Sequence, residues 1–547
     1  MFTLLGGERK KKWTTLVHNG PMFPPLYEPH NIPISYINPI NGETQKVYLN
    51  PKAEEIATLY AKILGHEILE NKTFQKNFWK DWKETLGSDS PIKELRNCDF
   101  YEINRYYLNQ KNILINLKPE EKEKIKKKKE AIEEKYQYCI IDGKKEKVGN
   151  FKIEPPGIFM GRGNNPNLGK IKRRINPEDV IINIGKEAPI PDTPSPNSDW
   201  KEVIHDETAI WLSSWKDTIT RKNKYIFTSH EAGFKSKSDE KKFNRARELK
   251  KIIKKIHLNN NKNIDSTDEK TRQLATALYL IDNLALRVGS SKNKKETADT
   301  VGVTSLRVEH LKLLENNYIK LDFLGKDSIR YCNKVKVSQE IYRNLKEFQK
   351  DKARKDQLFN LINSQTLNEY LKSFMPKLTS KVFRTYNASE TFQKGLNKIE
   401  SEKMEKLSEG ERINFLLELI NQANAEVAIL CNHQKAISSS FKNQIEKMDE
   451  RIKKSKKLLK KAKTSKSKSK KERIEKIKKK IKLMQIKKKT KLKMKNVSLG
   501  TSKNNYIDPR IIIAFMKKYN IPVDKIFNKT LENRFDWAMN IENDFNF

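Results

Sequence analysis

Residues 437–495 constrain the fold of this chain more than any other stretch of it. The segment is rich in lysine and carries about half of the net charge of +42, yet its apolar residues keep a heptad rhythm. They fall into two series on either side of the polar stretch 464–469, namely Ile445, Met448, Ile452, Leu459 and Ala462, then Ile474, Ile477, Ile481 and Met484. A disordered basic tail has no need of such spacing. We therefore expect two antiparallel helices joined by a tight turn.

The size and charge of the chain indicate how many domains it has and which kinds of partner it binds. With 547 residues, of which 36% are hydrophobic, it is long enough for several domains with cores of their own. A net charge of +42 repels itself in a compact state, so a polyanion is the natural partner, and nucleic acid fits best. A membrane fits worse, because no apolar run reaches spanning length and no lipidation motif occurs. The apolar run at the N-terminus is too short for a signal peptide.

The cysteine spacing and the motifs in the sequence limit the kinds of chemistry that the chain can carry out. Cys98, Cys139, Cys332 and Cys431 lie far apart and form no CxxC pair. This spacing favours reduced thiols in an intracellular protein over a disulfide framework or a zinc site. No GxxxxGK[ST] phosphate loop and no clustered metal-ligand spacing occurs either, so we expect no cofactor and no metal.

Hydrophobic periodicity divides the first half of the chain. Residues 1–50 are rich in Pro, Gly and Asn, a composition that predicts extended loop with short strands. The sequence then predicts helices over residues 51–69, 71–86 and 119–138. In the second helix, aromatic residues alternate with lysines, which indicates either a core stripe or a basic helix that faces DNA. Strand-like pieces follow at 139–141, 180–184, 209–212 and 224–227. The glycine-rich segment 157–166 around Arg162 fits either a phosphate-approaching loop or an ordinary surface loop.

The second half is mostly helical by the same reasoning. A helical period runs from Asp239 to Ser291 and includes Leu284, Ala285 and Arg287. Residues 318–335 predict a β-hairpin around Gly325. Helices are expected through about His433, and a small helical tail is expected over 508–547.

One tyrosine near the C-terminus, Tyr506, is a candidate nucleophile in the segment 499–508. Phosphodiester transfer without a metal needs a nucleophile, cationic donors for the transition state and an acid for the leaving oxygen. A tyrosine with a pKa of about 10 is ionised roughly one part in a thousand at pH 7, and nearby arginines lower the cost of ionising it. On its own, however, a tyrosine near a turn is more often a packing residue.

Long motifs give that tyrosine its context. The chain resembles eukaryotic-type DNA topoisomerase I, the type IB class, along nearly its whole length. The matching motifs occupy residues 150–157, 285–287, 296–302, 322–331, 381–389, 429–434 and 499–503. The resemblance implies that Tyr506 attacks DNA to give a 3′-phosphotyrosyl bond, that Arg287 and Arg384 bind the non-bridging oxygens with His433, and that Lys326 protonates the leaving 5′-oxygen.

The resemblance also implies an architecture. The expected fold is a multidomain α+β protein with a DNA-encircling clamp. The clamp consists of a mixed α/β cap and lobe, which are expected to meet at loops 160–167 and 292–296. The clamp adjoins a mainly helical catalytic core, an antiparallel coiled-coil linker and a small helical C-terminal domain. The domains expected are 1–29 with 118–231 (core subdomain I), 30–117 (cap), 232–436 (catalytic), 437–495 (linker) and 496–547 (C-terminal).

Partners and location follow from the same resemblance. It implies a monomer that relaxes double-stranded DNA without ATP or obligatory metal and acts in the nucleus, or in a viral factory or virion if the source is a large DNA virus. DNA-binding positions are expected at Arg162, Asp327, Asn505, Lys152 and Lys381. Three of these, Arg162, Asp327 and Asn505, match the pocket of camptothecin-type poisons.

The chain departs from the family pattern in three respects. We expect the chain to lack the long N-terminal extension of cellular members. Met160 stands where arginine is common, and the expected linker is more one-sidedly basic. Two other classes of protein share part of this pattern. A tyrosine recombinase shares the Arg-Lys-Arg-His-Tyr set, but it usually has His-x-x-Arg where this chain has Lys381-Val382-Phe383-Arg384. A DNA-packaging protein would explain the charge alone and would form no covalent adduct with DNA.

Overall fold

A computed structural model describes residues 11–194, 197–229, 233–290, 297–398, 408–435, 437, 440–464 and 470–547. The chain divides into two compact units. The N-terminal unit comprises residues 1–235 and 292–299, and the C-terminal unit comprises 236–291 and 300–547. The expected clamp loop 292–296 and most of the polar stretch 464–469 lie outside the described residues.

The β-rich part of the N-terminal unit contains the strands that the sequence predicts. One sheet has the order β10 (Glu202–Ile204), β9 (Val180–Asn183), β11 (Trp211–Lys216) and β12 (Asn223–Phe227), with only the β10–β9 pair parallel. A second sheet has the order β1 (Leu16–His18), β5 (Tyr138–Ile141) and β6 (Lys144–Lys147). Val180, Ile182 and Trp215 pack with Trp13 and Cys139 in one core. The expected strands at 139–141, 180–184 and 224–227 are therefore confirmed, and the expected 209–212 piece begins at Trp211.

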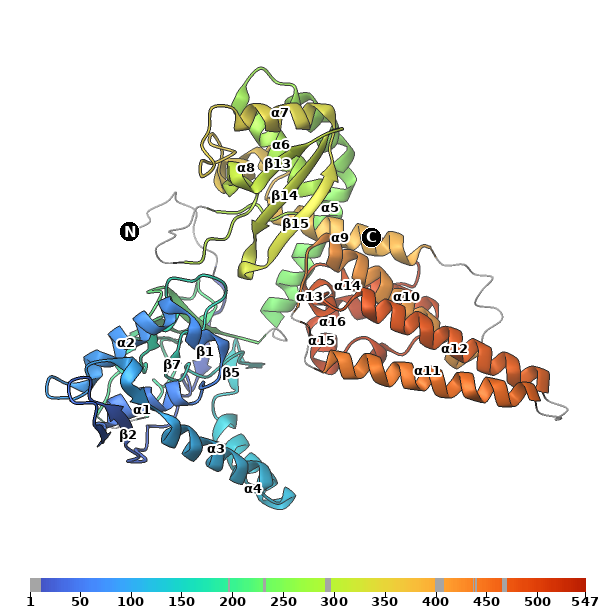
Figure 1. Cartoon of the computed structure of the whole chain (residues 1–547). Coiled ribbons are helices and arrows are strands. Elements are labelled where there is room, and N and C mark those ends of the chain that lie inside the picture. The colour runs from blue at the N-terminus through green and yellow to red at the C-terminus, as the bar shows by residue number, and fades with distance from the viewer. Residues whose placement is uncertain are drawn as a thin grey trace. The chain divides into compact units, whose positions relative to one another are not determined.

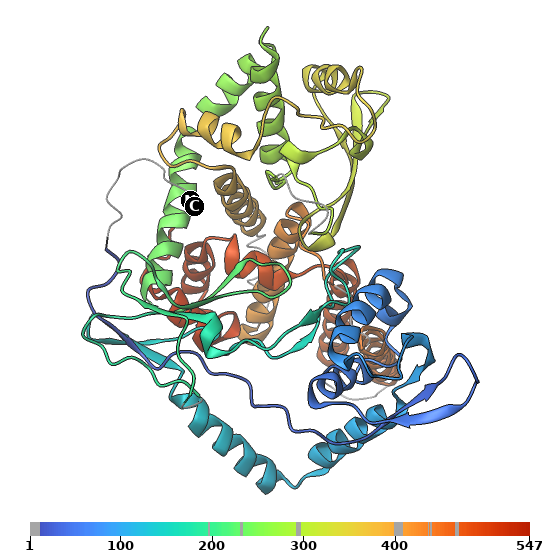
Figure 2. The same ribbon diagram turned by 90° about the vertical axis from the view of Figure 1, so that its left-hand side faces the viewer.

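The helical part of that unit covers a small sheet of β2 (Ile34–Ile37), β3 (Thr44–Val47) and β4 (Cys98–Asp99). Its helices are α1 (Pro51–Ala61), α2 (Lys72–Leu86), α3 (Tyr101–Asn116) and α4 (Pro119–Glu134), and a ribbon of β7 (Gly157–Ile158) and β8 (Ile171–Lys172) adjoins them. α3 is a helix that the sequence reading did not include. Only Ile103 of α3 and no residue of α4 is buried, and both helices lie along the outer edge of this unit (Figures 1 and 2).

Two predictions about these helices have different outcomes. The prediction of one helix from 51 to 69 is wrong, because α1 ends at Ala61 and a separate short turn, η1 (Glu67–Glu70), follows. Gly65 between them has φ +83°, a left-handed backbone that interrupts a helix. The aromatic stripe of α2 is core, since Phe74, Phe78 and Trp82 are buried. The lysines of α2 are exposed, as the core interpretation requires.

The C-terminal unit is mainly helical around one three-stranded antiparallel sheet. The sheet consists of β13 (Leu311–Leu314), β14 (Tyr318–Leu324) and β15 (Arg330–Lys336). The helices are α5 (Gly233–Ile264), α6 (Glu269–Asn283), α7 (Gln339–Gln349), α8 (Ser364–Lys372), α9 (Ser380–Leu396), α10 (Glu409–Leu430), α13 (Leu499–Asn505), α14 (Pro509–Lys518), α15 (Lys529–Arg534) and α16 (Asp536–Met539). The β-hairpin and the helical tail are thus confirmed. A single hydrophobic core runs from Phe243 through Phe383 to Phe547, so the tail packs into the same core as α9.

The helical period expected through Arg287 is wrong at its end. α6 stops at Asn283, and Ala285 adopts a positive φ of 47°. Leu284, Ala285 and Leu286 are nevertheless buried. Apolar residues at these positions fit a buried extended segment as well as a helix, so periodicity could not separate the two. Arg287 therefore lies beyond the helix on a non-helical segment.

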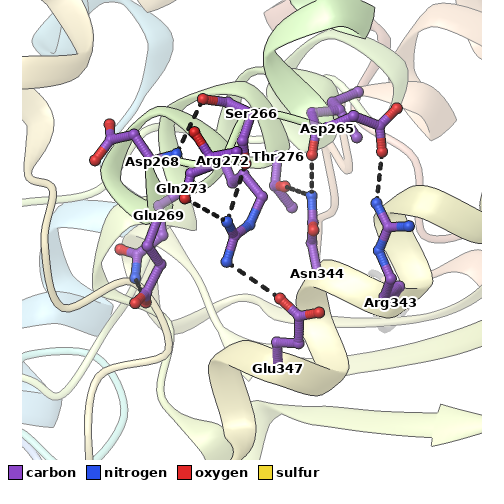
Figure 3. Close-up of polar contacts among 12 residues, drawn as sticks. Asp265, Ser266, Asp268, Glu269, Arg272, Gln273, Thr276, Arg343, Asn344 and Glu347 are labelled. Atoms are coloured by element: carbon purple, nitrogen blue, oxygen red, sulfur yellow. Dashed lines mark hydrogen bonds and ion pairs between the residues drawn. The ribbon is translucent and has the colours of Figure 1, made fainter.

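A polar network joins the loop between α5 and α6 to α7, which follows the sheet (Figure 3). Arg343 forms an ion pair with Asp265 at 2.5 Å, and Arg272 forms one with Glu347 at 3.2 Å. Beneath them the fully buried Asn344 donates from Nδ2 to the carbonyl of Ile264 at 2.8 Å. These contacts fix the helix that precedes Arg287 to the helix that follows the hairpin.

Asn344→Ala is expected to destabilise the C-terminal unit by about 1–3 kcal/mol, because it leaves the buried Ile264 carbonyl without its donor and opens a small cavity. The measurement is urea unfolding of the full chain. The neighbouring Arg343→Ala, which removes only an exposed ion pair, is the matched control and should cost under about 1 kcal/mol. Equal losses for the two variants would contradict the assignment of Asn344 as the anchor.

The lysine-rich segment forms α11 (Phe441–Thr464) and α12 (Lys470–Lys493), which pack side by side (Figure 1). Ile452, Ala462 and Ile481 are buried along their seam. Lys488, near the end of α12, reaches Asp449, near the start of α11, at 2.6 Å, as expected for antiparallel helices. The predicted helix pair is confirmed, and the alternative of a disordered basic tail is wrong.

Candidate active site

Tyr506 follows directly on α13, and its backbone is held from two sides. Its N–H donates to the carbonyl of Ser502 at 2.9 Å, and its own carbonyl accepts from Ser389 Oγ of α9 at 3.3 Å. The Asp508 N–H donates to the same Ser389 Oγ at 3.0 Å. Residues 499–505 form an ordered helix that leads directly into the tyrosine.

Arg287 reaches the tyrosine oxygen from the segment after α6. Its Nη2 donates to Tyr506 Oη at 3.2 Å. Its backbone carbonyl accepts from the N–H of Val303 at 2.9 Å. Beside it Gly302 lies so close to Gly289 that a Cβ on Gly302 would approach the Gly289 nitrogen to 2.4 Å, so this crossing needs glycine.

Arg384 enters the same site from α9 and is only 7% exposed. Its guanidinium lies 5.1 Å from the centre of the Tyr506 ring. Nη1 donates to the carbonyl of Ala285 at 2.6 Å, and Nη2 donates to the carbonyl of Cys431. Its Nε is buried and has no partner. A buried cationic donor without an acceptor, next to a tyrosine, is suited to an anionic oxygen.

His433 completes the group on the segment after α10. Its ring stacks on that of Tyr506 with centroids 5.1 Å apart and an interplanar angle of 29°. Nε2 lies 3.2 Å from Nη2 of Arg384, and Nδ1 lies 2.8 Å from Ser502 Oγ. Burial, reinforced by Arg384 and Arg287, lowers the pKa of His433 to about 3. The imidazole is therefore neutral near pH 7 and can serve as a hydrogen-bond donor but not as a cation.

Lys326 stands apart from these four. It is exposed in the short turn η6 (Lys326–Ser328) between β14 and β15, and no hydrogen bond or ion pair joins it to the other four described residues. The hairpin is nevertheless tied to the histidine segment. The carbonyl of Arg330 accepts from Asn432 Nδ2 at 3.3 Å and from Gln434 Nε2 at 3.4 Å, the two neighbours of His433.

The other expected DNA-binding residues fall into two groups. Asp327, Lys381 and Asn505 belong to the C-terminal unit, each adjoining or near a residue of the site: Asp327 follows Lys326, Lys381 is exposed one turn before Arg384, and Asn505 precedes Tyr506. Arg162 and Lys152 belong to the N-terminal unit. Lys152 pairs there with Glu133 at 2.6 Å.

Three groups in the site were missed by sequence reasoning. They are Ser502, Ser389 and the carbonyl of Cys431. Ser502 lies in one of the quoted motifs, but a serine in a motif does not indicate which side chain it contacts. A backbone carbonyl carries no sequence signal at all.

Comparison with known proteins identifies the family of the chain. The chain matches the families described as eukaryotic DNA topoisomerase I, DNA binding fragment, over residues 11–228, eukaryotic DNA topoisomerase I, catalytic core, over 231–466, and C-terminal topoisomerase domain over 478–547. It is 43% identical to DNA topoisomerase 1 of Caenorhabditis elegans over 553 residues, which cover 97% of this chain and 67% of that protein. The chain belongs to the eukaryotic DNA topoisomerase I family.

Two other relatives support this family membership. DNA topoisomerase 1 beta of Arabidopsis thaliana is 41% identical over 568 residues, covering 100% of this chain and 60% of the relative. DNA topoisomerase 1 of Homo sapiens is 41% identical over 564 residues, covering 98% and 72%. The chain thus spans about three fifths to seven tenths of the length of these relatives. Family membership leaves the recombinase and packaging interpretations without support.

The described residues contain neither a membrane-spanning helix nor a cluster of metal-ligating side chains. Across the described ranges, every helix is too short or too polar to pass through a bilayer. Within the same ranges, His, Cys, Asp and Glu side chains form no cluster of three or more that could hold a metal ion.

Proposed function

We propose that this topoisomerase I relaxes supercoiled duplex DNA of either sign by cutting and resealing one strand through Tyr506. The observation that carries the proposal is the set of contacts at the tyrosine. One arginine donates to its oxygen, and a second arginine beside its ring keeps a buried N–H free of protein acceptors. Such donors stabilise the charge that develops on the non-bridging oxygens of a phosphate under attack.

The chemical step uses only side chains. Tyr506 Oη forms a bond to the scissile phosphorus while its proton leaves to solvent, and the bond from phosphorus to the 5′-oxygen breaks. The leaving 5′-oxygen takes a proton from Lys326 Nζ, and His433 donates a hydrogen bond to a non-bridging oxygen. Resealing is the reverse attack by the 5′-hydroxyl. Because the phosphodiester energy is kept in the tyrosyl bond, neither ATP nor a metal is needed.

The basic helix pair and the expected clamp belong to the same proposal. Lysines of α11 and α12 face solvent along the pair, where they suit phosphate contact that is weakly sequence-selective and strongly salt-dependent. We propose that a monomer closes around the duplex, with the domain division 1–29 with 118–231, 30–117, 232–436, 437–495 and 496–547. Lys152 and Arg162 would contact DNA from the N-terminal unit, and the enzyme would act in the nucleus.

The test is relaxation of a negatively and of a positively supercoiled plasmid in EDTA without ATP. Relaxation of both, together with a protein–DNA adduct at the 3′ end of the cut after denaturation, is the expected result. Relaxation that needs ATP or magnesium, or an adduct at the 5′ end, would rule the proposal out.

Inhibition by camptothecin-type compounds is a further expectation. Asn505 precedes the proposed nucleophile in the sequence and Asp327 follows the proposed acid. We propose these two residues and Arg162 as the residues that such a compound contacts. Saturating compound should raise the steady-state level of covalent adduct severalfold, and Asn505→Ala should lower that increase without abolishing relaxation. The measurement is adduct on end-labelled DNA; an unchanged level with the unaltered chain contradicts the expectation.

A further inference from the structure

Ser502 contacts two parts of the site at once. It is fully buried in α13, and its Oγ lies 2.8 Å from Nδ1 of His433. Its carbonyl accepts the N–H groups of Tyr506 at 2.9 Å and of Ile507 at 3.0 Å. The same residue therefore supports the imidazole through its side chain and the nucleophile through its backbone.

The hydrogen bonds of His433 fix its tautomer in this structure. Arginine has only donors, so Nε2 of His433 must accept from Nη2 of Arg384 at 3.2 Å. A neutral imidazole then carries its proton on Nδ1, and Nδ1–H donates to Ser502 Oγ at 2.8 Å. In this arrangement the ring cannot donate from Nε2.

The proposed reaction needs the opposite arrangement. When Arg384 turns its donors to a phosphate, His433 must offer Nε2–H to the non-bridging oxygen, and its Nδ1 becomes an acceptor. A serine hydroxyl can hydrogen-bond to Nδ1 in both tautomers, because it accepts from Nδ1–H in one and donates to Nδ1 in the other. The change needs no net proton, since solvent takes the Nδ1 proton and returns one to Nε2.

We propose that Ser502 is a positioning residue whose hydroxyl holds His433 in both tautomers and so allows its Nε2–H to reach the reacting phosphate. This inference rests on the proposed function. An ionised Asp at this position would only accept and so would favour one tautomer, and Ala would leave Nδ1 buried without a partner.

The test is a double-mutant cycle of single-turnover cleavage on a duplex whose short fragment with the new 5′-hydroxyl dissociates after the cut. Ser502→Ala should form adduct about tenfold more slowly than the unaltered chain, less than the ~10²–10³ that loss of a whole donor costs. In a His433→Ala background the same substitution should have no further effect, because the hydroxyl acts through the ring.

A second fully buried serine supplies the matched control. Ser389 contacts the backbone of Tyr506 and Asp508 but not the imidazole, so the cost of Ser389→Ala should be the same with and without His433. Ser502→Thr, which keeps the hydroxyl, should recover most of the rate. If Ser502→Ala unfolds the chain, Ser502→Cys takes its place in the cycle, because it keeps the size and loses the strong donor.

A stereochemical readout separates positioning from general packing. Replacing each non-bridging oxygen of the scissile phosphate by methyl, one diastereomer at a time, should show a strong preference in the unaltered chain. Ser502→Ala should lose the same preference that His433→Ala loses. Additive costs in the cycle, or an intact preference in Ser502→Ala, would overturn the inference. Absence of adduct with the unaltered chain would instead overturn the proposed function.

Discussion

Tyr506→Phe should abolish both plasmid relaxation and covalent attachment to DNA. The substitution removes a single oxygen, the one to which Arg287 donates at 3.2 Å, and leaves a ring that can still stack on His433. Loss of the nucleophile removes the covalent pathway altogether, so the cleavage rate should fall by at least ~10⁴-fold, below detection in a gel assay. The measurement is adduct formed by a large molar excess of protein over labelled duplex.

DNA binding gives the internal control for this variant. Its affinity for duplex at fixed salt should match that of the unaltered chain, because the phosphate-binding cations are untouched. Tyr519→Phe, a tyrosine that packs on Phe515 away from the site, should relax plasmid normally. Relaxation by Tyr506→Phe at the rate of the unaltered chain would refute the assignment of the nucleophile.

Arg384→Lys is expected to have the next largest effect. Lysine keeps the charge but has no planar fork, so it cannot donate to the carbonyls of Ala285 and Cys431 and to a phosphate oxygen together. The loss of a preorganised donor predicts a cleavage rate about 10²–10³-fold lower. It is measured as the single-turnover rate at saturating protein, which separates the chemical step from binding.

A buried arginine elsewhere in the same unit separates chemistry from folding. Arg534 is 7% exposed like Arg384, and its Nε donates to Asp239 at 2.8 Å. Arg534→Lys should lower the midpoint of urea unfolding but leave the cleavage rate of the folded protein unchanged. If both substitutions reduce the cleavage rate equally, Arg384 acts through the fold and not on the phosphate.

Local patterns predicted the elements that depend on local physics. The aromatic stripe of α2, the hairpin of β14 and β15 and the lysine-rich pair α11 and α12 repeat at the period of their own secondary structure. The end of α6 could not be predicted in this way. Leu284 to Leu286 satisfy a helical period, but the left-handed residue Ala285 and the crossing of Gly302 over Gly289 depend on segments distant in sequence.

The sequence predicted a candidate set of site residues, but it could not predict their contacts. Family resemblance identified Arg287, Lys326, Arg384, His433 and Tyr506, which nothing in their own surroundings in the sequence would have selected. The structure brings four of them together and leaves Lys326 on an exposed turn. The unpartnered Nε of Arg384 and the serine behind His433 depend on side-chain geometry, which has no periodic signal in a sequence.

The helix pair α11 and α12 is anchored beside His433 of the candidate site. Lys435 N–H donates to the carbonyl of Asn496, and Ser498 N–H donates to the carbonyl of His433, both at 2.8 Å. These two hydrogen bonds form a short ladder that attaches the helix pair to the rest of the C-terminal unit, between the segment at His433 and the start of α13. If the helix pair contacts DNA as proposed, a force from twisted DNA would bend this ladder, which lies between the His433 segment and the helix that precedes Tyr506. Resealing would then become a load-dependent step.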